Sequence, residues 1–87
     1  MSKKPYIETQ IDDNTFIREF NNTDKSDLVW HRDKEDRTII PIEKTKWLFQ
    51  KDNELPIEIK EEIFIEKERY HRIIKRSGDL KVKIIKH

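Results

Sequence analysis

Apolar and polar residues alternate one by one over much of this 87-residue chain. The alternation is clearest in residues 7–11, 55–59 and 80–84, where every second residue is apolar or threonine. A period of two places one face of a β-strand on a core and the other face in water. The pattern therefore predicts three strands, whose core faces carry Ile7, Thr9 and Ile11, then Leu55, Ile57 and Ile59, then Leu80, Val82 and Ile84.

Six further short segments have the composition of strands, because they are rich in the β-branched and aromatic residues that favour a pleated surface. They are residues 15–20, 28–32, 37–43, 46–50, 63–66 and 70–75. Turn-forming residues separate the segments, for example Asp12-Asp13-Asn14 and Ser77-Gly78-Asp79. Many short strands with turns between them predict an all-β fold, a small barrel or a two-sheet sandwich.

Residues 56–78 also fit a helix. Pro56 could occupy the first helical position, acidic residues crowd the start, basic residues crowd the end, and Gly78 could end the helix. Ile59, Ile63 and other apolar residues fall roughly on one helical face, although Glu66 interrupts that stripe. The local pattern leaves both interpretations open for this segment.

The composition excludes several classes of protein. The chain has no cysteine, so it holds no disulfide, no cysteine zinc site and no thiol nucleophile. Its single glycine excludes glycine-rich phosphate-binding loops. Lys and Arg number 19 against 18 Asp and Glu, so nucleic acid is not expected as a partner held by a global positive field. No apolar run resembles a membrane span or a signal segment, so we expect a cytoplasmic protein without a membrane partner.

The candidate chemistry begins at His31, Asp33 and Glu35. On a strand these three side chains would project to the same face. One histidine and two carboxylates can bind a divalent metal such as Fe, Mn or Zn through nitrogen and oxygen donors, and His71 in a second predicted strand could complete the set. The alternative interpretation is a solvated, charged strand end in which His31 is hydrogen-bonded to a neighbouring carboxylate.

The large aromatic residues of the middle region would line either the core or the mouth of a ligand cavity. We expect Phe49 and Phe64 to pack in the core, and we expect Trp47 and Tyr70 to bind a ligand. Trp30 would point away from the face of its neighbour His31 and could serve a dimer interface.

The arginines could either bind an anionic ligand or form ion pairs on the surface. Arg37 lies close to the His31 cluster and, together with Glu35, is a candidate ligand-binding residue, because a guanidinium binds carboxylate or phosphate with two hydrogen bonds. We therefore expect a small anionic ligand. Arg69 and Arg76 are more simply explained as surface ion pairs with the abundant acidic residues.

Two stretches resemble the sequence motifs of a known family. Residues 28–33 (Leu-Val-Trp-His-Arg-Asp), followed by residues 42–47 (Ile-Glu-Lys-Thr-Lys-Trp), resemble the first cupin motif. Residues 60–71 (Lys-Glu-Glu-Ile-Phe-Ile-Glu-Lys-Glu-Arg-Tyr-His) resemble the second. The resemblance extends over about residues 25–85 and is strongest to very small single-domain cupins, some of them phage-encoded.

The resemblance implies a metal site and a fold. It implies His31 and His71 as metal ligands, with Asp33 in place of the second histidine of the first motif. The family's glutamate ligand falls at Arg37 or Thr38, so the match supplies no fourth ligand in register. In cupins, the counterpart of residues 60–70 is a strand and a turn, and the next strand begins at the position of His71. The resemblance thus favours strands over a helix in residues 56–78.

The chain departs from the family at its glycines. Lys60 and Glu68 stand where the second motif has glycine, and Lys44 or Lys46 stands where the first motif ends in glycine. Glycine commonly supplies a positive φ at such turns without steric cost. These larger residues must either adopt that conformation at a cost or form a different turn.

Together these observations predict one cupin-like domain over residues 1–87, with N-terminal strands in 1–24 and the cupin core in 25–85. A chain this short buries only about 60–65% of its unfolded surface, so we expect either marginal stability or stabilisation by a partner subunit in a homodimer. The expected function is binding of a divalent metal or a small ligand inside the barrel, and the chain does not show whether it is an enzyme. The alternative is a metal-free module whose strand edges and aromatic surface contact a protein or single-stranded nucleic acid.

Overall fold

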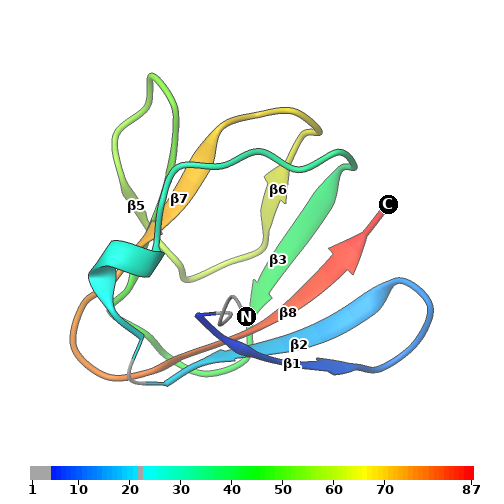
Figure 1. Cartoon of the computed structure of the whole chain (residues 1–87), viewed down its shortest axis with the longest axis horizontal. Coiled ribbons are helices and arrows are strands. Elements are labelled where there is room, and N and C mark those ends of the chain that lie inside the picture. The colour runs from blue at the N-terminus through cyan, green and yellow to red at the C-terminus, as the bar shows by residue number, and fades with distance from the viewer. Residues whose placement is uncertain (1–4, 22) are drawn as a thin grey trace.

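Two antiparallel sheets make up the protein in a computed structural model that describes residues 5–21 and 23–87. The five-stranded sheet has the order β1-β2-β8-β3-β6, and the three-stranded sheet has the order β5-β4-β7 (Figure 1). The strands are β1 (Ile7–Gln10), β2 (Thr15–Phe20), β3 (Arg37–Pro41), β4 (Leu48–Lys51), β5 (Ile57–Glu58), β6 (Ile63–Ile65), β7 (His71–Ile74) and β8 (Leu80–Lys86). A 3-10 turn, η1 (Lys25–Asp27), begins after Asp24, whose carboxylate accepts the backbone N–H of Ser26.

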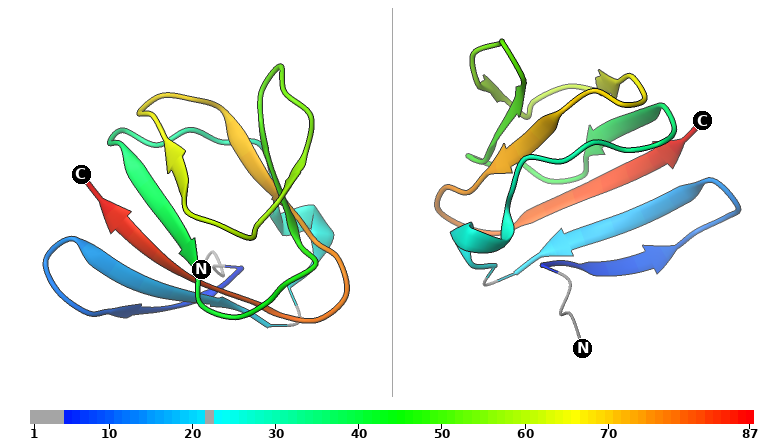
Figure 2. Two further views of the ribbon diagram at one scale, coloured as in Figure 1. Left: turned by 180° about the vertical axis from the view of Figure 1, so that it is seen from behind. Right: turned by 45° about the horizontal axis from the view of Figure 1, so that its top comes forward.

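The all-β prediction is confirmed, and the helical alternative for residues 56–78 is wrong. That segment forms β5, β6 and β7, as the family resemblance implied. The two views of Figure 2 show β8 running beside β2 on one side and β3 on the other, so the C-terminal strand lies in the middle of its sheet. Within the described residues, no helix is long and apolar enough to cross a membrane.

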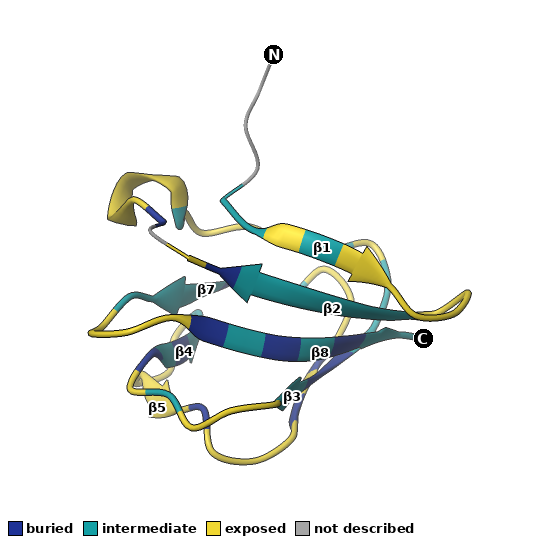
Figure 3. Ribbon diagram, turned by 90° about the horizontal axis from the view of Figure 1, so that it is seen from below, coloured by how far each residue is buried: buried dark blue, intermediate teal, exposed yellow. Residues whose placement is uncertain are grey.

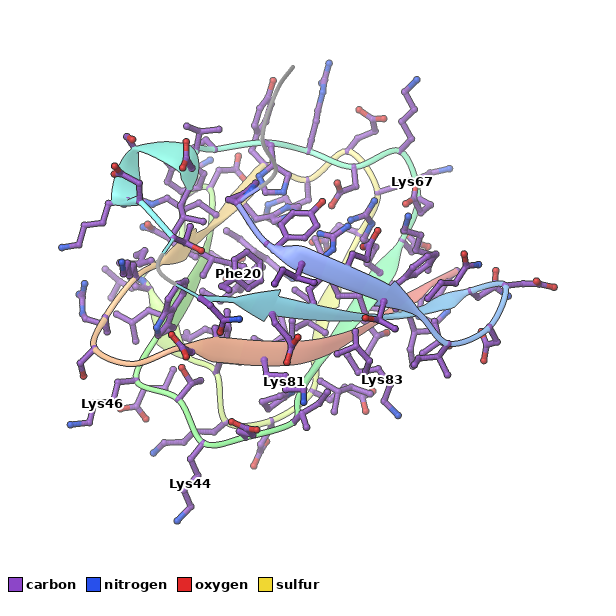
Figure 4. All side chains as sticks on the ribbon, turned by 60° about the horizontal axis from the view of Figure 1, so that its bottom comes forward. Phe20, Lys44, Lys46, Lys67, Lys81 and Lys83 are labelled. Carbon is purple, nitrogen blue, oxygen red and sulfur yellow. The ribbon has the colours of Figure 1, made fainter. Side chains whose placement is uncertain are left out.

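The core lies between the two sheets. β8 shows its alternation most clearly: Leu80, Val82 and Ile84 are 0%, 1% and 4% exposed, as predicted. Figure 3 shows this as alternating buried and partly buried positions along β8. In Figure 4, Lys44 and Lys46 point away from the body of the protein. The core is formed by Phe20, Ile39, Trp47, Phe49, Ile59, Ile63, Ile65, Leu80, Val82 and Ile84.

Strand β1 corrects one prediction, because its apolar face points outward. Ile7 and Ile11 are 60% and 58% exposed. The pairing register explains this. Glu8 lies opposite Arg18, and Arg18 lies opposite the buried Val82, so Glu8 and not Ile7 belongs to the inner face. Alternation reveals the period of a strand but not its phase, and a shift by one residue exchanges the two faces.

Other sequence predictions also need correction. Residues 28–32 do not form a regular strand; they contribute one isolated bridge, between His31 and His71. Phe64 is half exposed, because β6 turns Ile63 and Ile65 inward and Phe64 to the outer face. Leu55 and Ile57 are likewise exposed, and only Ile59 of that alternating set is buried.

At the turns where the family has glycine, this chain either keeps the left-handed backbone or forms a different turn. Glu68 has φ +64°, so at this position the chain keeps a left-handed turn with a residue that carries a side chain. Among the described residues, positive φ otherwise occurs at Asn53 and Gly78, so Lys44 and Lys60 form their turns with ordinary backbone angles. A left-handed conformation costs a residue with a Cβ atom roughly 1–2 kcal/mol.

The Glu68 turn supports a testable prediction. We expect Glu68→Gly to raise the free energy of unfolding by about 0.5–1 kcal/mol, because relief of the strain exceeds the extra chain entropy of glycine. The ion pair with Arg32, at 3.2 Å between half-exposed side chains, offsets little of this gain. Urea denaturation of Glu68→Gly and of the control Glu68→Gln provides the measurement. A Glu68→Gly protein less stable than Glu68→Gln would contradict the prediction.

Candidate metal centre

The backbone brings His31 and His71 face to face. The N–H of His31 donates to the carbonyl of His71 at 3.0 Å, and the N–H of His71 donates to the carbonyl of His31 at 2.9 Å. Because the two residues exchange both backbone hydrogen bonds, they form a hydrogen-bonded antiparallel pair. The side chains of such a pair project to the same side. The two imidazole rings accordingly lie 4.4 Å apart, centre to centre, at an angle of 62°.

Asp33 is held beside the two histidines by the turn at Glu68. The backbone N–H of Glu68 donates to the Asp33 carbonyl at 2.7 Å. The Asp33 carboxylate then lies with Oδ2 3.3 Å from Nε2 of His71. One ligand atom from each of His31, Asp33 and His71 falls within 4.8 Å of the others. The structure thus brings together the three residues for which the sequence predicted a metal-binding role.

The hydrogen bonds of the two imidazoles determine which ring nitrogens are available. Nδ1 of His31 lies 3.0 Å from the carbonyl oxygen of Val29, and Nδ1 of His71 lies 2.7 Å from that of Arg69. A carbonyl oxygen only accepts, so each Nδ1 carries the proton. In the neutral rings, Nε2 is then the unprotonated nitrogen, the form that binds a metal.

The Asp33 carboxylate is charged and one of its oxygens lacks a donor. Burial raises the pKa of this carboxyl, but the contact with His71 and the positive charge of Arg37 outweigh burial, so the pKa lies below its ordinary value. Oδ2 is buried and receives no hydrogen bond in the structure. Nε2 of His71 lies 3.3 Å from this oxygen, and in the neutral ring it has no proton to donate, because Nδ1 holds the proton. A cation between the two atoms would satisfy both acceptors.

Arg37 and Glu35 lie next to Asp33 but do not belong to the three residues whose ligand atoms converge. Arg37 contacts Oδ1 of Asp33 at 3.4 Å, the oxygen that does not face His71. Its Nε and one terminal nitrogen donate to Glu35 at 3.0 and 2.7 Å. Arg37 therefore orients the carboxylate while leaving Oδ2 to the histidines. The predicted ligand-binding roles of Glu35 and Arg37 stay predictions.

A cavity of about 310 Å³ adjoins the three residues. Its walls come from the inner faces of both sheets and from the segment that follows η1. The apolar part consists of Phe20, Leu28, Val29, Ile39, Ile65, Ile73, Val82 and Ile84. His71 lies in its wall and is buried, whereas His31 is exposed, so the candidate centre has both a protected side and an open side.

Arg18 and Tyr6 also line this cavity, and the sequence analysis did not identify either. The sequence does contain a pattern that could have identified Arg18. It stands between Phe16 and Phe20 at the spacing of one strand face, so a charged residue interrupts an otherwise aromatic inner row. Tyr6 lies outside the strand pattern and gave no such signal.

The two aromatic residues predicted to bind a ligand lie elsewhere. Trp47 is 0% exposed; its ring packs 5.8 Å from that of Phe20, and its Nε1–H donates to the carbonyl of Gly78 at 2.9 Å. Tyr70 is 44% exposed and borders a separate surface hollow together with Trp30. No contact in the structure tests a ligand-binding role for Trp47 or Tyr70.

Comparisons with known proteins find similarity in structure but not in sequence. No protein-family model matches the sequence, and no curated protein matches it. Solved structures do match. A cupin domain from Bordetella pertussis aligns with a TM-score of 0.62 and 18% identity over 100% of this chain and 98% of that one. A cupin-2 domain containing protein from Shewanella frigidimarina aligns with a TM-score of 0.59 and 18% identity over 92% and 76%.

A third solved structure, the protein NMB1881 from Neisseria meningitidis, aligns with a TM-score of 0.62 and 12% identity over 93% of this chain and 81% of that chain. At these identities the likeness concerns the path of the backbone and not a shared activity. The strand order, the two facing sheets and the structural matches agree, and this chain has the cupin fold.

Proposed function

We propose that this protein binds one divalent transition metal ion, Fe, Mn or Zn, through Nε2 of His31, Nε2 of His71 and Oδ2 of Asp33. Two observations carry the proposal: one ligand atom from each of the three residues falls within 4.8 Å of the others, and Oδ2 of Asp33 is buried without a hydrogen-bond donor. Acceptors that face one another without a shared proton repel, and a cation removes that repulsion.

The donor chemistry supports the same ion class. Two imidazoles and one carboxylate are the donors of mononuclear Fe(II) sites and of many catalytic zinc sites. Two ligands about 2.0–2.2 Å from a common ion are separated by roughly 2.8–3.6 Å at tetrahedral or octahedral angles, and the 3.3 Å between His71 and Asp33 falls in that range. Three protein ligands leave coordination positions open, as in catalytic sites.

The surrounding residues prepare the ligands. Backbone carbonyls hold the Nδ1 protons of His31 and His71, which fixes the direction of each ring. Arg37 holds the second oxygen of Asp33. When bound, such an ion supplies Lewis acidity toward an oxygen of a ligand. We propose that a small ligand binds in the adjoining cavity, whose wall includes apolar side chains from both sheets.

The metal-free alternative has a surface of its own. Exposed Trp30 and Tyr70 carry the guanidinium groups of Arg72 and Arg32 over their rings, at 4.7 and 5.3 Å. Such a surface could stack single-stranded bases. Asp52 and Glu54 border the same hollow, however, and their charge opposes a phosphate backbone. This observation favours the metal centre as the functional site.

Metal analysis combined with thermal melting tests the proposal. We expect the purified protein to take up close to one equivalent of Fe(II), Mn(II) or Zn(II), and we expect EDTA to lower the melting temperature. A metal at about a hundredfold excess over its Kd should raise the melting temperature by about 10 °C or more in a domain of this size. Uptake far below one equivalent, with melting unaffected by all three metals, would overturn the proposal.

A further inference from the structure

We propose that the cavity binds a small carboxylic acid with an apolar body, and that Arg18 binds its carboxylate. The inference rests on the proposed function in taking this cavity as the ligand site. It adds the chemical class of the ligand and a residue that determines specificity.

Arg18 occupies a position where the fold calls for an apolar side chain. The inner row of β2 runs Phe16, Arg18, Phe20, and Arg18 lies opposite the buried Val82 of β8. The side chain is only 13% exposed and lines the cavity. A charge on an inner sheet face is costly to bury, and departures from binary patterning of this kind concentrate at functional sites.

The guanidinium of Arg18 is held in place yet retains hydrogen-bond donors. Its Nε–H donates to Glu8 at 2.7 Å, and its Cζ lies 4.2 Å from the centre of the Tyr6 ring. A guanidinium carries five N–H groups, and the contact with Glu8 engages the one on Nε. Within the described residues, no hydrogen bond from the two terminal amino groups of Arg18 is present. These groups can bind a carboxylate through two parallel hydrogen bonds.

Arg37, the other arginine of the cavity, lacks this availability. All three of its nitrogens contact Glu35 or Asp33, at distances of 2.7 to 3.4 Å. A second anion on Arg37 would have to displace one of these carboxylates. Between the two arginines, Arg18 is therefore the one that can accept a ligand carboxylate without breaking an internal ion pair of the metal centre.

The rest of the cavity specifies the body of the ligand. Its walls include several branched aliphatic side chains, such as Ile73, Val82 and Ile84, which favour an apolar body. The two lining arginines balance the two lining aspartates, Asp27 and Asp33, so a bound divalent ion makes the cavity positive. The volume of about 310 Å³ is at the small end of ligand pockets. A compact acid of about ten non-hydrogen atoms fits these constraints.

Titration with benzoate tests the proposal, with the neutral isostere benzamide as the control ligand. We expect benzoate to shift backbone amide resonances of cavity residues in NMR spectra of the zinc-loaded protein. Arg18→Gln should weaken benzoate binding at least about tenfold, since a hydrogen bond to a charged group is lost. Benzamide should bind weakly to both proteins.

Arg72→Gln is the matched control variant. Arg72 also donates through Nε, to Gln50 at 2.9 Å, and also lies over an aromatic ring, but it faces the outer surface beside Trp30. It should bind benzoate like the parent protein. If Arg18→Gln does not fold, the double variant Glu8→Gln/Arg18→Gln replaces it, because an amide pair can keep the cross-strand contact without charge.

The outcomes separate this inference from the proposed function. Absence of benzoate shifts, equal binding of benzamide, or unchanged affinity in the arginine variant would each overturn the role of Arg18, even if the protein binds zinc. Arg18-dependent benzoate binding in a protein that takes up no metal would support the inference and overturn the metal proposal. The same titration in EDTA-treated protein distinguishes these cases.

Discussion

Replacement of His71 by alanine is expected to abolish stoichiometric metal binding. His71 supplies the most buried donor of the candidate centre, with its Nε2 3.3 Å from Asp33. Loss of a residue that only orients a metal ligand costs about 10–100-fold in affinity, so loss of the ligand itself should cost more than about a hundredfold. Zinc affinity is measured by competition with a chromophoric chelator.

The control for this prediction is the third histidine of the chain. His87 is also hydrogen-bonded through its ring, to Thr38 at 2.7 Å, but it lies outside the converging set. His87→Ala should bind zinc like the parent protein. Because His71 is buried, His31→Ala and Asp33→Asn provide variants less prone to unfold, and we expect both to lose affinity as well. Equal affinities for the His87, His31 and Asp33 variants would contradict the assignment.

Replacement of Trp47 by alanine should have the largest effect on stability. Trp47 is fully buried against Phe20 and donates its indole N–H to the Gly78 carbonyl. Truncation of a buried tryptophan costs about 3–5 kcal/mol, which is a large share of the roughly 5–15 kcal/mol that stabilises a typical domain. We expect a large decrease in the free energy of unfolding, measured by urea denaturation.

The second tryptophan is the matched control. Trp30 is 41% exposed and contacts Arg72 across its ring. Trp30→Ala should cost no more than about 1 kcal/mol, the value of an exposed cation–π contact. Trp47→Phe, which keeps most of the aromatic volume, should fall between the two and should fold if Trp47→Ala does not. Similar costs for Trp30→Ala and Trp47→Ala would show that Trp47 is not a centre of the core.

The sequence was sufficient to predict most of the strands and the three residues that converge at the candidate centre. Leu80, Val82 and Ile84 alternate with lysines on a central strand, and a strand with paired neighbours on both sides has little freedom to choose its inner face. His31 and Asp33 share a short spacing, His71 was a candidate from a second predicted strand, and the family resemblance implied both histidines as ligands. Their convergence depends on a single backbone bridge, which no local pattern reveals.

The failures concern positions whose environment is set by partners distant in sequence. Ile7 and Ile11 face outward because β1 is an edge strand whose phase follows from the pairing of Glu8 with Arg18. Phe64 is exposed for a similar reason, since β6 is the opposite edge of the same sheet. Hydrophobicity alone does not distinguish the two faces of an edge strand.

The shortage of glycine in this chain points to one strained turn, at Glu68. The family comparison placed Glu68 at a glycine position, and the structure gives this residue a left-handed backbone. The strained turn is the one that hydrogen-bonds the Asp33 carbonyl. Strain at this point accompanies a functional candidate, as is common for strained backbone positions.

His31 and His71 should present unprotonated Nε2 atoms, together with Asp33, to one metal ion. A zinc titration of histidine-labelled protein, followed by long-range ¹H–¹⁵N NMR, tests this arrangement. We expect both rings to carry their proton on Nδ1 before zinc is added, and we expect the Nε2 resonances of both rings to shift together and saturate at one equivalent while His87 stays unchanged. Protonation of either ring on Nε2 alone, or Nε2 resonances that zinc leaves unchanged, would contradict it.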